Sequence, residues 1–117
     1  MDRLTERLDD IELLLNPKFK DRNYSLSKHE QEVFVALYVG KRLTLNQIAK
    51  RIGFTTDMVN NYLINIIGKG VPIQKEIVED LLVFSIDPDF RDLQARRNLL
   101  NIDPKVSQQV VQFEFEQ

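Results

Sequence analysis

The chain has 117 residues, 43% hydrophobic and 29% charged, a composition typical of a folded protein rather than a disordered one. It contains no cysteine, which excludes a disulfide scaffold, a thiolate metal site and a cysteine nucleophile. Met1 to Asn16 is interleaved with charge, and no apolar run approaches the roughly 18 residues of a membrane span. We therefore expect a cytoplasmic protein that makes no membrane contact.

The formal net charge of −2 conceals an uneven distribution. Between Lys41 and Lys75, six basic residues stand against one acid, Asp57, which gives this stretch a net charge of +5 and leaves −7 for the rest. Such asymmetry is how a small acidic protein can present a surface that faces DNA.

The first element is a predicted helix over residues 1–16, ended by Asn16 and Pro17. Its apolar positions are spaced 4, 3 and 4 apart and form a heptad-like seam: Leu4, Leu8, Ile11 and Leu15. Because two heptads are too short to be stable alone, the seam must dock on the body of the domain or pair with its copy in a second chain. We expect a homodimer in which these four residues serve dimerisation, with residues 1–25 as helix and connector.

A second helix begins at Ser27, which forms a capping box with Glu30, and it ends at Gly40. Residues 43–45 fit either a short strand or the entry to the next helix. Leu45 to Ile52 follows as a helix that Gly53 terminates, and Thr55 is a good N-cap for another helix whose apolar stripe runs from Val59 to Ile67.

The stretch from Leu45 to Leu63 has the pattern of a helix-turn-helix. Ala49 is the small residue that lets the second helix cross closely, and Gly53 is the turn residue that tolerates positive φ. The helix contacts are supplied by Ile48, Ile52, Phe54, Val59 and Tyr62.

Residues 73–86 fit an amphipathic helix or a hairpin, and the β-favouring segment from Leu81 to Ile86 favours the hairpin. Asp87 and Pro88 then start a further helix. Asp103 and Pro104 are expected to break it, and the alternation of Val111, Phe113 and Phe115 predicts a strand in the tail, residues 102–117.

Three segments, 26–33 (LSKHEQEV), 45–54 (LNQIAKRIGF) and 59–63 (VNNYL), resemble the helix-turn-helix core of many prokaryotic regulators. Residues 68–73 (GKGVPI) and 84–88 (FSIDP) are similar to the wing region of winged-helix regulators of the MarR and TrmB kind. The resemblance covers roughly residues 26–101. It implies a winged helix-turn-helix domain, mainly α with a small β-hairpin (α+β), extended by the N-terminal helix and a C-terminal helix and strand.

The same resemblance implies that the helix after Thr55 enters the major groove of double-stranded DNA. Carried onto this chain, the base contacts are Thr55, Thr56, Asp57, Asn60 and Asn61, and the phosphate contacts are Lys41, Arg42, Lys50, Arg51, Lys69 and Lys75. A two-fold dimer would place two such helices about one DNA turn apart.

Several features depart from this pattern. The helix after Thr55, which would enter the major groove, carries no Arg or Lys on its exposed face, but it does carry Asp57 and Ile64 there. The tip of the predicted hairpin is acidic, with Glu79 and Asp80. A helix-turn-helix that docks on another protein would look similar, and a plasmid or viral replication or partition accessory protein would use the same fold on DNA. We nevertheless expect a transcriptional regulator.

Enzymatic chemistry is not expected. His29 is the only histidine and is interpreted as a surface residue, while the acids at 87, 89 and 92 are explained by helix capping. No phosphate-binding glycine loop, nucleophile–base pair or metal-ligand spacing occurs in the sequence. We therefore predict no enzyme activity, no cofactor and no metal.

Overall fold

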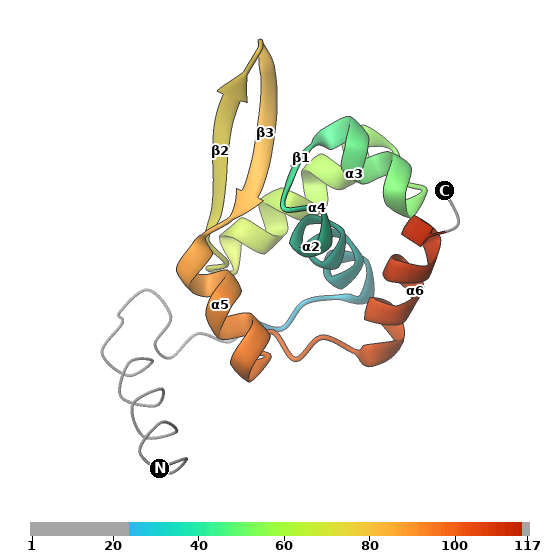
Figure 1. Cartoon of the computed structure of the whole chain (residues 1–117), viewed down its shortest axis with the longest axis vertical. Helices are drawn as coiled ribbons and strands as arrows, with labels where there is room; N and C mark the ends of the chain where they lie inside the picture. The colour runs from blue at the N-terminus through green and yellow to red at the C-terminus, as the bar shows by residue number, and fades with distance from the viewer. Residues whose placement is uncertain (1–23, 116–117) are drawn as a thin grey trace.

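The computed structural model describes residues 24–115, with side chains described as far as Val111. The seam predicted at Leu4, Leu8, Ile11 and Leu15 lies outside the described residues. The described elements are α2 (Lys28–Gly40), β1 (Arg42–Thr44), α3 (Leu45–Ile52), α4 (Thr56–Gly68), β2 (Ile73–Val78), β3 (Leu81–Ile86), α5 (Pro88–Arg97) and α6 (Pro104–Phe115) (Figure 1). These five helices and one small antiparallel sheet confirm the predicted α+β fold of winged-helix type.

Helix α2 lies at the centre of the molecule (Figure 1). Five consecutive residues, 33–37, are at most 6% exposed, so the helix is buried on every side in its middle turns. This is possible because α3, α4, α6, β1 and β3 all pack against it. A helix that is apolar all round needs such complete cover, and its predicted capping box is confirmed, with the Ser27 hydroxyl accepting from the Glu30 N–H at 3.2 Å.

The sheet has the order β1-β3-β2 and is antiparallel throughout. Leu43 of β1 pairs with Phe84 of β3, and both side chains are buried on the inner face of the sheet. Strands β2 and β3 form the predicted hairpin. Of residues 43–45, for which the sequence left a strand or a helix start open, the first two belong to β1 and Leu45 begins α3. The hairpin extends away from the helices as an arm (Figure 1).

The tip of the hairpin is a two-residue turn, because Val78 pairs directly with Leu81. Its central residues, Glu79 and Asp80, have φ angles of 51° and 67°. Positive φ at both positions is the geometry of a type I′ turn, which favours Asn-Gly because L-residues other than Asn, Asp and Gly are strained there. This turn therefore carries backbone strain.

Relieving that strain should stabilise the protein. Replacing Glu79→Asn together with Asp80→Gly is expected to raise the free energy of unfolding by about 1 kcal/mol, measured by urea titration. The matched control, Glu79→Ala with Asp80→Ala, removes the same charges without making positive φ easier and should give no gain. An equal gain in both pairs would show that charge repulsion, and not backbone geometry, limits the turn.

The prediction of a strand in the C-terminal tail is wrong, because residues Pro104–Phe115 form helix α6. The prediction that Asp103 and Pro104 break the preceding helix is also wrong, because α5 already ends at Arg97, where Asn98 in the left-handed conformation is the C-cap. The pair instead starts α6, just as Asp87 and Pro88 start α5. The Asp103 carboxylate accepts from the Lys105 N–H at 2.9 Å, and proline at a first helical position gives up no hydrogen bond. Val106 and Val110, four residues apart, are buried in the same core as α2.

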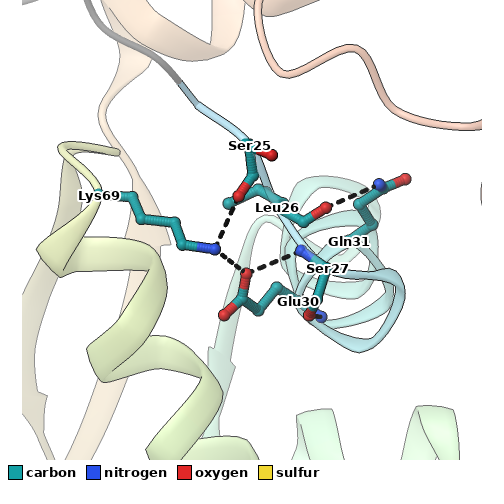
Figure 2. A network of polar contacts seen from close by, with 6 residues as sticks. All are labelled: Ser25, Leu26, Ser27, Glu30, Gln31 and Lys69. Carbon is teal, nitrogen blue, oxygen red and sulfur yellow. Dashed lines mark hydrogen bonds and ion pairs between the residues drawn. The ribbon is translucent and has the colours of Figure 1, made fainter.

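A network of polar contacts joins the start of α2 to the end of α4 (Figure 2). The Lys69 ammonium donates to the Glu30 carboxylate at 2.5 Å and to the Ser25 carbonyl at 2.7 Å. Gln31 extends the network, because its amide donates to the Leu26 carbonyl at 3.1 Å and accepts from the Asp103 N–H at 2.9 Å. The network thus fixes α2, α4 and the entry to α6 relative to one another.

Glu30 is held ionised within this network although its side chain is only 6% exposed. Burial raises the pKa of the carboxyl, but hydrogen bonds from Lys69 and from the Ser27 N–H outweigh it, so the pKa lies below its ordinary value of 4.5. A carboxyl whose pKa is depressed on folding contributes stability that is fully present above its unfolded pKa and is lost as the pH falls through the folded pKa.

Glu30→Gln should therefore cost more stability at neutral than at acid pH. We expect a loss of about 1–2 kcal/mol in the free energy of unfolding at pH 7, because a charge-assisted hydrogen bond is replaced by a weaker one. The difference from the natural protein should shrink as the pH falls below the ordinary pKa of 4.5 and through the lower pKa of the folded state. Denaturant titrations across this range measure it, and a difference independent of pH would contradict an ionised Glu30.

No described helix combines the length and the apolar character needed to cross a membrane.

Candidate nucleic-acid interface

The turn between α3 and α4 is built as the sequence predicts. Gly53 has φ 73° and ψ 29°, in the left-handed region, and Ala49, 4% exposed, lies beneath the crossing. The N–H of Phe54 donates to the Ala49 carbonyl at 3.0 Å, which closes the turn. Thr55 then caps α4, because its hydroxyl accepts from the Met58 N–H at 3.2 Å.

Gly53 is required for its backbone geometry alone, since an added Cβ would meet no atom within 4 Å. Gly53→Ala should therefore lower the free energy of unfolding by about 1–2 kcal/mol through strain at positive φ. Gly68→Ala is the matched control, because its Cβ also meets nothing and its position at the end of α4 is helical. That variant should be neutral or stabilising. Equal effects in thermal or urea unfolding would contradict this account of the turn.

Helix α4 has two distinct faces. Its inner face consists of Val59, Leu63 and Ile66, each at most 1% exposed. All five residues proposed to contact bases are exposed at the N-terminal part of the helix: Thr55, which is its N-cap, Thr56, Asp57, Asn60 and Asn61. Of these, Asp57 and Asn61 lie on the outer face, directly opposite the inner one. The helix thus presents a polar surface of hydroxyl and amide groups that can donate and accept hydrogen bonds to a partner.

Three further residues belong to this outer face but were not among the predicted contacts. Met58 and Ile64 are 38% and 57% exposed, and Asn65 is exposed as well. Asn65 lies four residues after Asn61, so helical periodicity was the signal that could have identified it. Apolar and amide groups therefore alternate along the outer face of α4.

A cluster of three aromatic rings packs beside the turn between α3 and α4. His29 packs edge-on against Phe54 with ring centroids 5.2 Å apart, and Tyr62 lies 5.8 Å from both rings. His29 is on the surface, as predicted, and its Nδ1 is 3.3 Å from a Glu32 carboxylate oxygen. The cluster fixes the first turn of α2 against the loop that carries Thr55.

The six basic residues proposed to grip phosphates do not form one patch. Lys50 and Arg51 occupy the last turn of α3, beside the turn at Gly53. Arg42 lies on the outer face of the sheet, the face opposite Phe84, where it pairs with Glu76 of β2. Lys41 and Arg42 line a shallow hollow of about 410 Å³ there, together with Arg91 of α5.

The other two basic residues are placed differently again. Lys75 pairs with Phe84 across the hairpin, so it belongs to the inner face of the sheet and is exposed. Lys69 follows α4 at the end opposite Thr55, roughly 20 Å away along a helix of this length. Its ammonium is bound to Glu30 and Ser25, which gives Lys69 a structural contact that the sequence did not reveal.

The hairpin tip is apolar as well as acidic. Ile77 is 75% exposed and Leu81 58%, with Val78 and Leu82 also exposed beside the Glu79–Asp80 turn. A cluster of this kind on an extended arm is unlike a surface made to lie against phosphates. It resembles the apolar centre with a polar rim that is found where proteins contact one another.

Comparison with protein-family models found no match, and comparison with curated proteins found no significant relative. Among the described residues, no group of three or more His, Cys, Asp or Glu side chains is placed to hold a metal ion.

Proposed function

We propose that this chain is a sequence-specific DNA-binding protein, a transcriptional regulator that inserts α4 into the major groove. The observation that carries the proposal is the turn at Gly53, with five polar residues of Thr55–Asn61 exposed at the N-terminal part of α4. A helix held by its apolar face and open on its polar face is the element that reads base edges in helix-turn-helix proteins. We propose that the protein carries out this function in the cytoplasm, and binding DNA requires neither enzyme activity nor a cofactor.

Within this function, Asn60 and Asn61 are the residues best suited to reading sequence. An Asn amide can bind an adenine edge through two hydrogen bonds, and each such pair discriminates by about 1–3 kcal/mol. Lys50 and Arg51 would contact phosphates beside them. The homodimer predicted from the seam in residues 4–15 stays a prediction, because those residues lie outside the described part of the chain.

The test begins with selection of bound duplexes from a random DNA pool, followed by competition against scrambled sequence. Asn60→Ala with Asn61→Ala should weaken binding to the selected site about 10–100-fold while changing affinity for scrambled DNA little. Gln109→Ala, an exposed change on α6, is the matched control and should leave both affinities unchanged. Equal loss on both sequences would contradict base reading by these residues.

A second experiment distinguishes residues that contact phosphates from residues that contact bases. Lys50→Ala with Arg51→Ala should weaken binding to all sequences alike and should reduce the salt dependence of binding by about one unit of slope for each lost phosphate contact. No binding to any duplex at low ionic strength by the natural protein would refute the proposal as a whole.

One observation favours a second candidate function, a module that docks on another protein. Ile64 on α4 and Ile77 and Leu81 on the hairpin are the most exposed large hydrophobic residues described, and α4 carries no basic side chain. If the random pool yields no binder, Ile77→Ser with Leu81→Ser should abolish capture of a protein partner, whereas Asn60→Ala should not.

A further inference from the structure

A groove runs between α2, α5 and α6, on a part of the molecule that the proposed DNA interface does not use. Its volume is about 540 Å³, within the range of sites that hold a ligand or a peptide segment. Its apolar lining comes from all three helices and the loop before α6: Val35, Tyr38, Val39, Ala95, Ile102 and Val111.

Four polar side chains besides Tyr38 line the groove, Gln94, Asn98, Ser107 and Gln108, and the first two are hydrogen-bonded within the protein. The Gln94 amide donates to the Asn98 side chain at 2.7 Å and accepts from the Leu100 N–H at 3.0 Å. The Asn98 side-chain oxygen also accepts from the Ile102 N–H at 3.0 Å. These two side chains thus organise the link from α5 to α6, and no charged residue lines the groove. The groove is therefore suited to an apolar occupant.

The sequence contains a segment of the required chemistry. The seam Leu4, Leu8, Ile11 and Leu15 supplies four apolar anchors along one side of a predicted helix, which needs an apolar surface to be stable. An amphipathic helix laid in an apolar groove, with anchors at this spacing, is a recurring mode of recognition. The acidic residues of the segment, such as Glu6 and Asp9, fall on the opposite side and would stay in water.

The described chain begins close to the groove. Tyr24 packs on Phe90 of α5 with ring centroids 5.6 Å apart, and Phe90 packs on Phe34 at 6.4 Å. Phe34 itself lines the groove. The seven connecting residues, 17–23, span at most about 24 Å, roughly twice the path through these two ring contacts. The segment can therefore reach the groove of its own chain.

We propose that residues 1–16 pack as an amphipathic helix into the groove between α2, α5 and α6 of the same chain. A short connector gives the segment an effective concentration of millimolar order at its own groove, above the concentration of a second copy in ordinary solution. The docked helix joins α5 to α6 across α2 and leaves the outer face of α4 uncovered. Of the two roles that the sequence allows for the seam, docking on the body is the one this groove fits.

The absence of cysteine makes the contact directly testable by disulfide trapping in the full chain. Ala95→Cys, at an exposed position in the groove wall, is combined in turn with Leu4→Cys, Leu8→Cys and Ile11→Cys. At least one pair should oxidise rapidly to a species that runs as a monomer without reductant, because a disulfide forms only when the two Cα atoms come within about 7 Å.

The matched control is Leu13→Cys with Ala95→Cys, since residue 13 lies on the side of the predicted helix opposite the seam. Its oxidation should be at least tenfold slower. Disulfide-linked dimers, formed between tagged and untagged copies mixed before oxidation, would overturn the proposal in favour of a second copy in the groove. If no seam pair oxidises faster than the control, the proposal is wrong, and the groove is open to another ligand.

A second measurement does not depend on cysteine. Leu8→Asp should lower the midpoint of thermal unfolding by about 5–10 °C at low micromolar concentration, because a buried anchor is lost. Leu13→Asp makes the same chemical change on the opposite side and should shift the midpoint by less than about 2 °C. Equal shifts, or a Leu8→Asp shift that appears only at high protein concentration, would count against docking within one chain.

Discussion

The burial of the middle turns of α2 is the constraint on which the rest of the structure depends. A helix whose middle turns are apolar on all sides cannot stand at a surface, so α3, α4, α6 and the inner face of the sheet must each cover part of it. Because α4 is committed to this task through Val59, Leu63 and Ile66, its polar residues are forced outward. The Glu30–Lys69 pair adds orientation, since it ties the end of α4 to the beginning of α2.

Much of this architecture follows from local signals. The capping box at Ser27, the N-cap at Thr55, the glycine at the turn and the apolar period each depend on residues close in sequence, and they placed α2, α3 and α4. The capping box that Thr44 and Gln47 form at the start of α3 was a further local signal that the prediction from sequence missed. The tail was predicted wrongly because Asp103 and Pro104 were interpreted as the end of the preceding helix, which in fact ends at Arg97, whereas the pair only begins α6. The alternation near Phe113 also imitates a strand. The i, i+4 pair Val106 and Val110 decides for helix, since it reaches the core that α2 provides.

In the candidate site, too, some features follow from local sequence and others depend on tertiary contacts. Exposure of Asn60 and Asn61 follows from helical period and needed no tertiary knowledge. The positions of the basic side chains could not be predicted from local sequence. They depend on the sheet face on which each strand residue lies and on ion-pair partners that are distant in sequence. Arg42 pairs with Glu76 and Lys69 with Glu30, contacts 34 and 39 residues apart, and these set where positive charge is offered to a ligand.

The hairpin arm leaves the outer edge of β2 without a neighbouring strand in the described sheet. An open edge with apolar residues at its end is a template on which another chain can add a strand and begin aggregation. Glu79 and Asp80 place negative charge at the tip, beside those apolar residues, and like charges on the tips of two arms repel one another. The acidic turn thus lowers the folding stability of the protein but opposes its aggregation at high concentration.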